Sequence, residues 1–165
     1  MGYFRILVLF LLGTQVVIAD SYVLLGKGVR QGSYNLAVGK HLIKTDNAKL
    51  GLEVEFSSMG AQPRGFQNVN KMINLTGVTH ARLSDRWHGF GKFGANNTYY
   101  SHNGSNSYSR KNDSLWGWVA SVGLEYELTD SVYTHVGVAT HEYRQVNNPN
   151  MGGFTHSYAG IRIEL

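Results

Sequence analysis

The sequence predicts an all-β protein, an eight-stranded antiparallel up-and-down transmembrane β-barrel. Apolar and polar residues alternate with period two in several segments, and the connections between these segments are short and long in turn. Aromatic residues stand near the ends of the apolar stretches. The composition agrees, because 20 glycines, only 2 prolines and 12% aromatic residues favour strands and turns over helices.

The N-terminus has the pattern of a cleaved export signal. Arg5 supplies the positive charge, residues 6–12 are apolar, and Val17 to Ala19 match the small-residue cleavage site. A membrane-spanning anchor is the alternative, but it would need roughly 20 apolar residues. Residues 13–15 interrupt the apolar run well before that length, so we expect cleavage.

We therefore expect residues 1–19 to be removed and residues 20–165 to form one barrel domain in the cell outer membrane. The chain has no cysteine, so disulfides cannot stabilise this small exported domain, whereas closing the edges of a sheet can. The formal net charge of +4 falls by one, to +3, without Arg5. This small and dispersed charge gives no reason to expect nucleic acid as a partner.

The clearest strand covers residues 115–128. Apolar and aromatic residues from Trp116 to Leu128 share one face, while Gly, Ser and Glu residues dominate the other. A strand of about thirteen residues is long for a globular protein and suits a tilted membrane crossing. Similar or weaker alternation elsewhere brings the total to eight strands, near residues 22–29, 34–41, 50–56, 73–82, 87–95, 132–141 and 158–165.

The connections fall into two classes. Three are short and contain Asp, as tight turns do: residues 44–47, 83–86 and 128–131. Three are longer and more polar: residues 57–68, 99–113 and 144–153. Only the first connection, near residues 30–33, is short for its class. Short turns at one end and long loops at the other are the layout of bacterial outer-membrane barrels, whose chain ends face the periplasm.

The two faces of the strands predict two sets of residues. Aromatic girdles at the membrane interfaces are expected from Trp87, Tyr99, Trp116, Trp118 and Tyr126. A polar network in the lumen is expected from Glu53, Glu55, Arg82, Lys92, Glu125, Glu127, Arg162 and Glu164. Buried charges need partners, so we expect a plugged lumen, with a narrow small-solute channel as the alternative. A soluble barrel would instead turn its apolar face inward.

Three stretches resemble the small eight-stranded outer-membrane proteins, namely the transmembrane domain of outer membrane protein A and the X and attachment-invasion-locus type barrels. They are Leu75 to Ala95 with its Leu-Ser-Asp turn, Val119 to Asp130, and Ser157 to Leu165. Leu165 stands where this family usually ends in Phe. The resemblance implies contact with outer-membrane lipid and lipopolysaccharide, insertion by the barrel-assembly machinery, and adhesion or colonisation through extracellular loops.

Binding to a host surface is expected mainly from residues 57–68 and 99–113. The second of these segments is rich in Tyr, Asn and Ser, a composition suited to adaptable contacts. Arg110 and Lys111 within it are expected to meet lipopolysaccharide phosphates.

We expect no catalytic, cofactor or metal site. Six histidines fall on the polar phases without recognisable ligand spacing, so interior hydrogen bonding is favoured over metal binding or acid sensing: His41, His80, His88, His135, His141 and His156. His141 to Tyr143 resembles the surroundings of a lipid A deacylase site, but Tyr143 replaces the nucleophilic Ser, leaving only Ser157. A structural or surface-interaction barrel is therefore favoured over a channel, a lipid A enzyme or a soluble periplasmic barrel.

Overall fold

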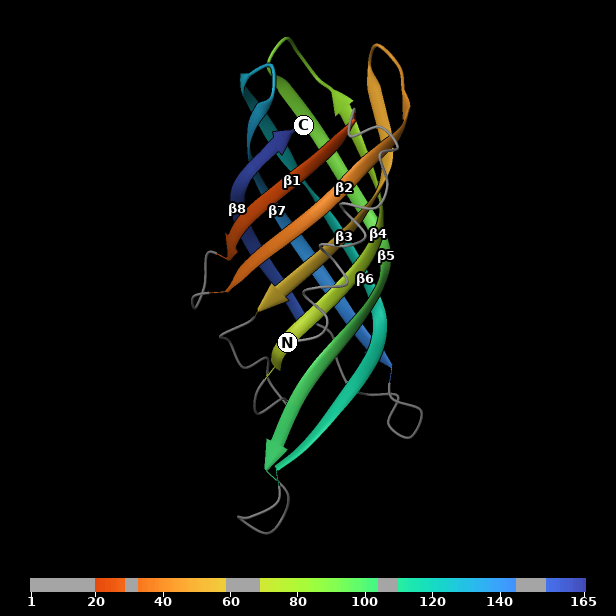
Figure 1. The fold of residues 1–165 in the computed structure, drawn as a ribbon, viewed down its shortest axis with the longest axis vertical. Helices are drawn as coiled ribbons and strands as arrows, with labels where there is room; N and C mark the ends of the chain where they lie inside the picture. The colour runs from red at the N-terminus through yellow and green to blue at the C-terminus, as the bar shows by residue number, and fades with distance from the viewer. Residues whose placement is uncertain (1–19, 29–32, 59–68, 104–109, 145–153) are drawn as a thin grey trace.

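The protein is an antiparallel barrel of eight strands, closed by pairing of the first strand with the last (Figure 1). The computed structural model describes residues 20–28, 33–58, 69–103, 110–144 and 154–165. The strands are β1 Ser21–Gly28, β2 Tyr34–Lys44, β3 Ala48–Ser58, β4 Val69–Arg82, β5 Trp87–Asn103, β6 Arg110–Thr129, β7 Val132–Arg144 and β8 Phe154–Glu164. The described residues contain no helix that is long and apolar enough to cross a membrane. The predicted fold class is confirmed.

The three tight turns and the described chain ends meet at one end of the barrel, which we call the turn end (upper end in Figure 1). Backbone hydrogen bonds join them there: the N–H of Glu164 donates to Ser131 and the N–H of Leu165 donates to Ser21, at 2.8 and 2.9 Å. The opposite end, which we call the loop end, carries the connections that were predicted to be long. This arrangement follows from the up-and-down order, because every second connection returns to the same end.

Side chains alternate between a lumen face and an outer face along each strand. In β1, Tyr22 and Leu24 point inward and are buried, whereas Leu25 is exposed. The predicted phase of β6 is confirmed, because Ser121 and Glu125 are buried while Val122 and Leu124 are exposed. The apolar face is therefore on the outside of the barrel.

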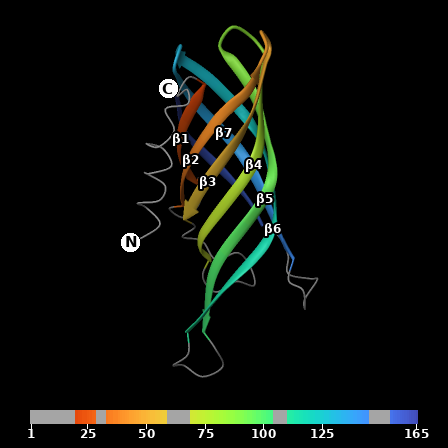
Figure 2. The ribbon, with the colours of Figure 1, turned by 45° about the vertical axis from the view of Figure 1, so that its right-hand side comes forward.

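The prediction of a loop over residues 99–113 is wrong in its bounds. Pairing between β5 and β6 continues from Tyr99 with Ser114 to Asn103 with Arg110, so the two strands run beyond their neighbours (Figure 2). The period-two signal, on which the strand prediction rests, is absent from this part of the sequence. Backbone pairing continues without it.

Several predictions lie outside the described residues. The export signal of residues 1–19 is among them, and so are the connecting segments 29–32, 59–68, 104–109 and 145–153. The side chains of Arg110 and Lys111 are also outside the described part, although their backbone belongs to β6. These expectations stay predictions.

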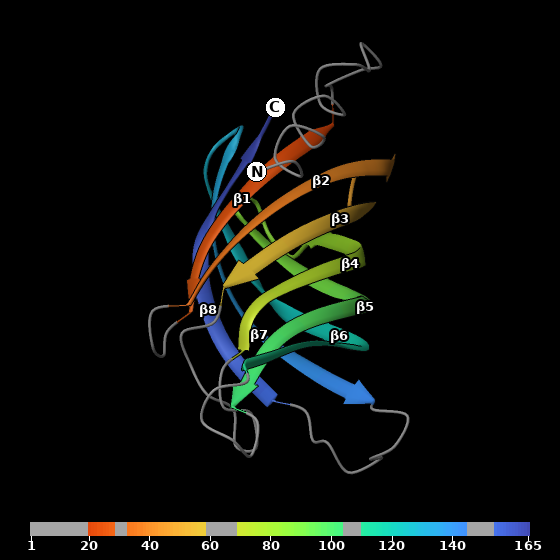
Figure 3. The same cartoon turned by 60° about the horizontal axis from the view of Figure 1, so that its bottom comes forward.

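Large rings fill the middle of the lumen where the adjoining strands carry glycine. Phe90, Gly123, Gly137 and Tyr158 are consecutive cross-strand partners on β5 to β8. Phe90 lies over both glycines and Tyr158 lies over Gly137, where a Cβ atom would come within 2.8 Å of Phe90 and 3.0 Å of Tyr158. The glycines leave space for these rings inside the lumen. The strands curve around this interior (Figure 3).

Candidate functional site

Arg162 on β8 is the centre of the interior charge network. Its side chain is 2% exposed, and its Nε and Nη2 both donate to Glu125 on β6 at 2.9 Å. Its Nη1 donates to Glu164 at 2.7 Å, and Lys49 reaches the same carboxylate at 2.6 Å. The Nδ1 of His80 lies 3.0 Å from Glu125. Each of the three guanidinium nitrogens thus donates one hydrogen bond to a carboxylate, the strongest pairing available to Arg.

A second ion pair lies deeper in the lumen. Lys92 on β5 donates to Glu53 on β3 at 2.6 Å, and the hydroxyl of Tyr22 donates to the other oxygen of Glu53 at 2.8 Å. Arg162 lies over the Tyr22 ring, 5.3 Å from its centroid, and connects the two pairs. We call these five groups the central plug: Tyr22, Glu53, Lys92, Glu125 and Arg162. Its two cations balance its two carboxylates, as buried charges require.

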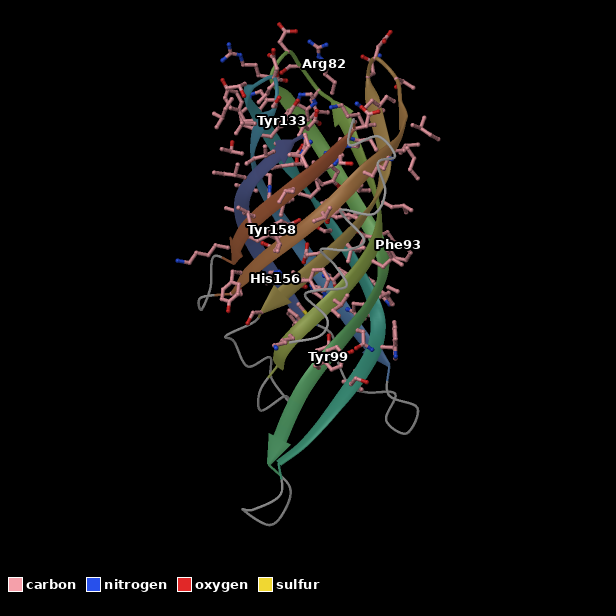
Figure 4. All side chains as sticks on the ribbon, in the orientation of Figure 1. Arg82, Phe93, Tyr99, Tyr133, His156 and Tyr158 are labelled. Carbon is pink, nitrogen blue, oxygen red and sulfur yellow. The ribbon has the colours of Figure 1, made fainter. Side chains whose placement is uncertain are left out.

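The other predicted lumen residues lie nearer the two ends. Glu55 accepts hydrogen bonds from Ser57 and Asn74, and Glu127 lies 3.3 Å from His88. Arg82 differs, because its side chain is 48% exposed at the turn end, where it pairs with Asp85. Arg82 belongs to the inward-facing residues of β4, but it stands where the strand ends at the rim of the barrel (Figure 4).

Interior aromatic residues are the part of the site that the sequence interpretation missed. Tyr22 binds Glu53, Tyr158 shares a hydrogen bond of 2.6 Å with Ser121, and the Tyr133 ring lies 4.0 Å below the Arg162 guanidinium. Tyr133 and Tyr158 occupy the polar phases of their strands. An aromatic residue on a polar phase, with glycine on a neighbouring strand, was the available signal.

Replacing Tyr22 with Phe is the mildest substitution that tests the central plug. The change removes only the hydroxyl that donates to Glu53, which stays bound to Lys92, so we expect a loss of about 1–3 kcal/mol in unfolding free energy. The control is Tyr34→Phe, at a side chain that is 64% exposed, where we expect almost no change. Urea unfolding in phosphatidylcholine vesicles measures both, and equal losses would contradict the assigned role of Tyr22.

Two cavities lie on either side of the plug. The larger one, about 280 Å³, opens at the turn end and is bordered by Lys49, His80, His88, Tyr133 and Arg162 among others. The smaller one, about 10 Å³, lies toward the loop end and borders Lys92 and Tyr158. Since Arg162 borders the first cavity and Lys92 the second, the plug stands between them.

Six histidines of the described residues lie on the lumen side of their strands. His141 stacks on Phe154 and His156, with ring centroids 4.8 and 5.3 Å apart, and its Nδ1 lies 3.2 Å from Asn96. Among the described residues no three His, Cys, Asp or Glu side chains are grouped to hold a metal ion. Ser157 is exposed on the outer face of β8, whereas His141 is buried inside. The Ser157–His141 pairing left open by the sequence is therefore not formed.

On β5 and β6 the outer wall carries an apolar surface with aromatic rings near both ends. Phe93 on β5 is 65% exposed at mid-height (Figure 4), and Val122 on β6 is 66% exposed. At the turn end Trp87 contacts Tyr126 with centroids 5.0 Å apart, and Trp116 is 67% exposed toward the loop end. Trp116 and Tyr126 are about ten residues apart on β6. In a strand tilted by about 40°, this separation corresponds to a height of about 25 Å along the barrel axis.

The remaining predicted girdle residues lie on the same outer face. Tyr99 is 48% exposed beyond Phe93 on β5, and Trp118 packs against Phe93 with ring centroids 6.2 Å apart. On β5 and β6 the rings at each end thus bound an apolar band about 25 Å tall.

No protein-family model matches the sequence, and no curated protein matches it. Solved structures do resemble the fold. The N-terminal β-barrel domain of Pseudomonas aeruginosa OprF is 15% identical, with a TM-score of 0.65, covering 88% of this chain and 97% of that one.

Two further structures agree with it. Ail, the attachment invasion locus protein of Yersinia pestis, is 9% identical with a TM-score of 0.56, covering 87% and 91% of the two chains. Neisserial surface protein A is 10% identical with a TM-score of 0.54, covering 88% and 93%. At these identities the likeness concerns the fold. The chain has the fold of the small eight-stranded outer-membrane barrels.

Proposed function

We propose that the chain is an integral outer-membrane protein with a structural or surface-interaction role. The observation that supports this most strongly is the inversion of the barrel, with charged pairs such as Arg162–Glu125 inside and residues such as Phe93 and Val122 outside. Water would penalise such an outer wall, whereas a bilayer would stabilise it. The names of two structural neighbours, a surface protein and an attachment invasion locus protein, agree with such a role.

In the proposed orientation the turn end faces the periplasm and the loop end faces outward. The extended β5–β6 hairpin then projects furthest from the membrane (Figure 2). We propose that it and the other connections at this end meet lipopolysaccharide and a host-surface ligand. The barrel-assembly machinery would be a partner during insertion.

A narrow channel is the second candidate, favoured by the charged interior and by the cavity of about 280 Å³ at the turn end. It ranks lower because Lys92 and Arg162 are engaged by Glu53 and Glu125 within the lumen. Moving an ion past them would require breaking paired buried charges.

Gel mobility and bilayer recordings test the proposal together. The protein in an outer-membrane fraction should migrate differently before and after boiling, because a closed barrel resists detergent until it is heated. Purified protein in planar bilayers should show no conductance above that of lipid alone. A mobility that does not respond to boiling would contradict the membrane barrel, and steady ion conductance would favour the channel.

A further inference from the structure

The apolar band on the outer wall is not equally tall around the barrel. On β6 the outward residues are apolar or aromatic from Leu128 at the turn end to Trp116, about twelve residues away. On β8 they are apolar only from Leu165 to Ala159, about six residues. With a rise of about 3.3 Å per residue and a tilt of about 40°, these runs correspond to heights of roughly 30 and 15 Å.

Beyond the end of the shorter apolar run, toward the loop end, the outward side chains are polar. Ser157 and Thr155 follow Ala159 on the outer face of β8, Thr140 follows Val138 on β7, and Lys27 follows Leu25 on β1. Thr140 pairs directly with Thr155. Ser157 and Lys27 are each offset by one outward position toward the turn end, because Ser157 pairs with Val138 and Lys27 pairs with Ala159. The hydroxyls of Thr140 and Thr155 are 3.0 Å apart. We call this patch the short wall: Lys27, Thr140, Thr155 and Ser157.

The short wall begins at a depth where the opposite wall is still apolar. Ser157 lies about eight residues from Leu165, and Ala95 on β5 lies about eight residues from Trp87, both counted from the turn end. Each is therefore about 20 Å above that end. Ala95 pairs with Leu75 and Trp118, both on the apolar face, and the outer rings lie beyond it. The two positions share a depth but not an environment.

The shape of the barrel agrees with this difference. β1 and β2 stop well short of the point that β5 and β6 reach at the loop end (Figure 1). A hydrophobic surface shorter than the bilayer is accommodated by thinning of the lipid and by flanking side chains that reach the headgroups. Lys27 is exposed and forms no ion pair with any residue that the structure describes. Its ammonium and the neighbouring hydroxyls suit a phosphate group.

We infer that the short wall binds the phosphate-bearing headgroups of the outer leaflet and thins the membrane beside β7, β8 and β1. Against an apolar band about 25 Å tall, it draws these headgroups roughly 10 Å toward the bilayer centre. This inference rests on the proposed outer-membrane location. The chain would then have a directional membrane surface, with a full-thickness side at β5 and β6 and a thinned side opposite. The lipid headgroups would lie deeper at the short wall than at β5 and β6.

Single cysteines test the inference directly, since the native chain contains none. Ser157→Cys, Ala95→Cys and Val122→Cys are each folded into phosphatidylcholine nanodiscs, which leave both membrane surfaces accessible, and treated with a charged water-soluble maleimide. We expect Ser157→Cys to react at least tenfold faster than Ala95→Cys and Val122→Cys. After boiling in detergent all three should react alike.

The outcomes separate this inference from the proposed function. Equal protection of Ser157→Cys and Ala95→Cys would overturn the short wall and leave the membrane barrel intact. Rapid labelling of Val122→Cys in nanodiscs, at mid-height of the band, would instead refute membrane insertion itself.

An apolar version of the patch supplies a second test. In the Ser157→Cys protein, the changes Lys27→Leu, Thr140→Val and Thr155→Val should raise the local apolar band and slow labelling toward the rate of Ala95→Cys. Ala120→Val, which enlarges an outer residue of β6 without lengthening the band, should leave the Ser157→Cys rate unchanged. An unchanged rate in the apolar version would overturn the inference.

Discussion

Replacing Arg162 with Met should destabilise the folded barrel by about 3–5 kcal/mol, because it leaves buried carboxylates without their cation. Arg162 holds Glu125 through two hydrogen bonds and Glu164 through one. His80 and Lys49 remain near these carboxylates, but neither can replace a bidentate guanidinium. Urea unfolding in phosphatidylcholine vesicles, followed by tryptophan fluorescence, measures the loss.

Two further variants identify the cause. Adding Glu125→Gln to Arg162→Met removes the unpaired charge and should restore part of the stability. Arg82→Met removes a cation whose side chain is 48% exposed, so its pairing with Asp85 should contribute at most about 1 kcal/mol. Similar losses for Arg162→Met and Arg82→Met would mean that the plug does not hold the interior together.

The sequence predicts which residues of the network face inward, but not which of them bind one another. Period two places Glu53, Glu125 and Glu164 on polar phases, and any of them is a chemically reasonable partner for Arg162. The choice depends on shear and closure, since Arg162 on β8 reaches Glu125 across β7. No local pattern in the sequence contains that information.

The ends of the strands illustrate a second limit. Alternation identifies a strand only where the two faces meet different surroundings, so it fails for Tyr99 to Asn103 and for the start of β6, where pairing continues without an apolar phase. The short wall shows the converse. Thr155 and Ser157 are visible in the sequence as polar residues on an apolar phase, but their neighbour Lys27 is found only when β1 pairs with β8.

Placing Val at Gly137 should destabilise the barrel by about 1–3 kcal/mol, as overpacking of a filled interior does. A Cβ atom there meets only side chains, with Phe90 at 2.8 Å and Tyr158 at 3.0 Å. Gly77 is the matched control, because it lies on the outer face of β4 and its Cβ would find nothing closer than 3.8 Å. Gly77→Val should be neutral or stabilising, since Val suits a strand better than Gly does.

Removing the Phe90 ring, which lies over Gly137, tests whether the ring causes this loss of stability. Phe90→Ala alone should cost about 3–5 kcal/mol by opening a cavity beside Tyr158. Combined with Gly137→Val, it should cost clearly less than the sum of the two single changes, because the added methyl groups occupy space that the ring has left. Vesicle unfolding of the four proteins gives the coupling free energy. Additive losses would mean that Gly137 is required by its backbone and not by the ring, and that the large-over-small packing of Phe90 and Tyr158 does not determine how the lumen is filled.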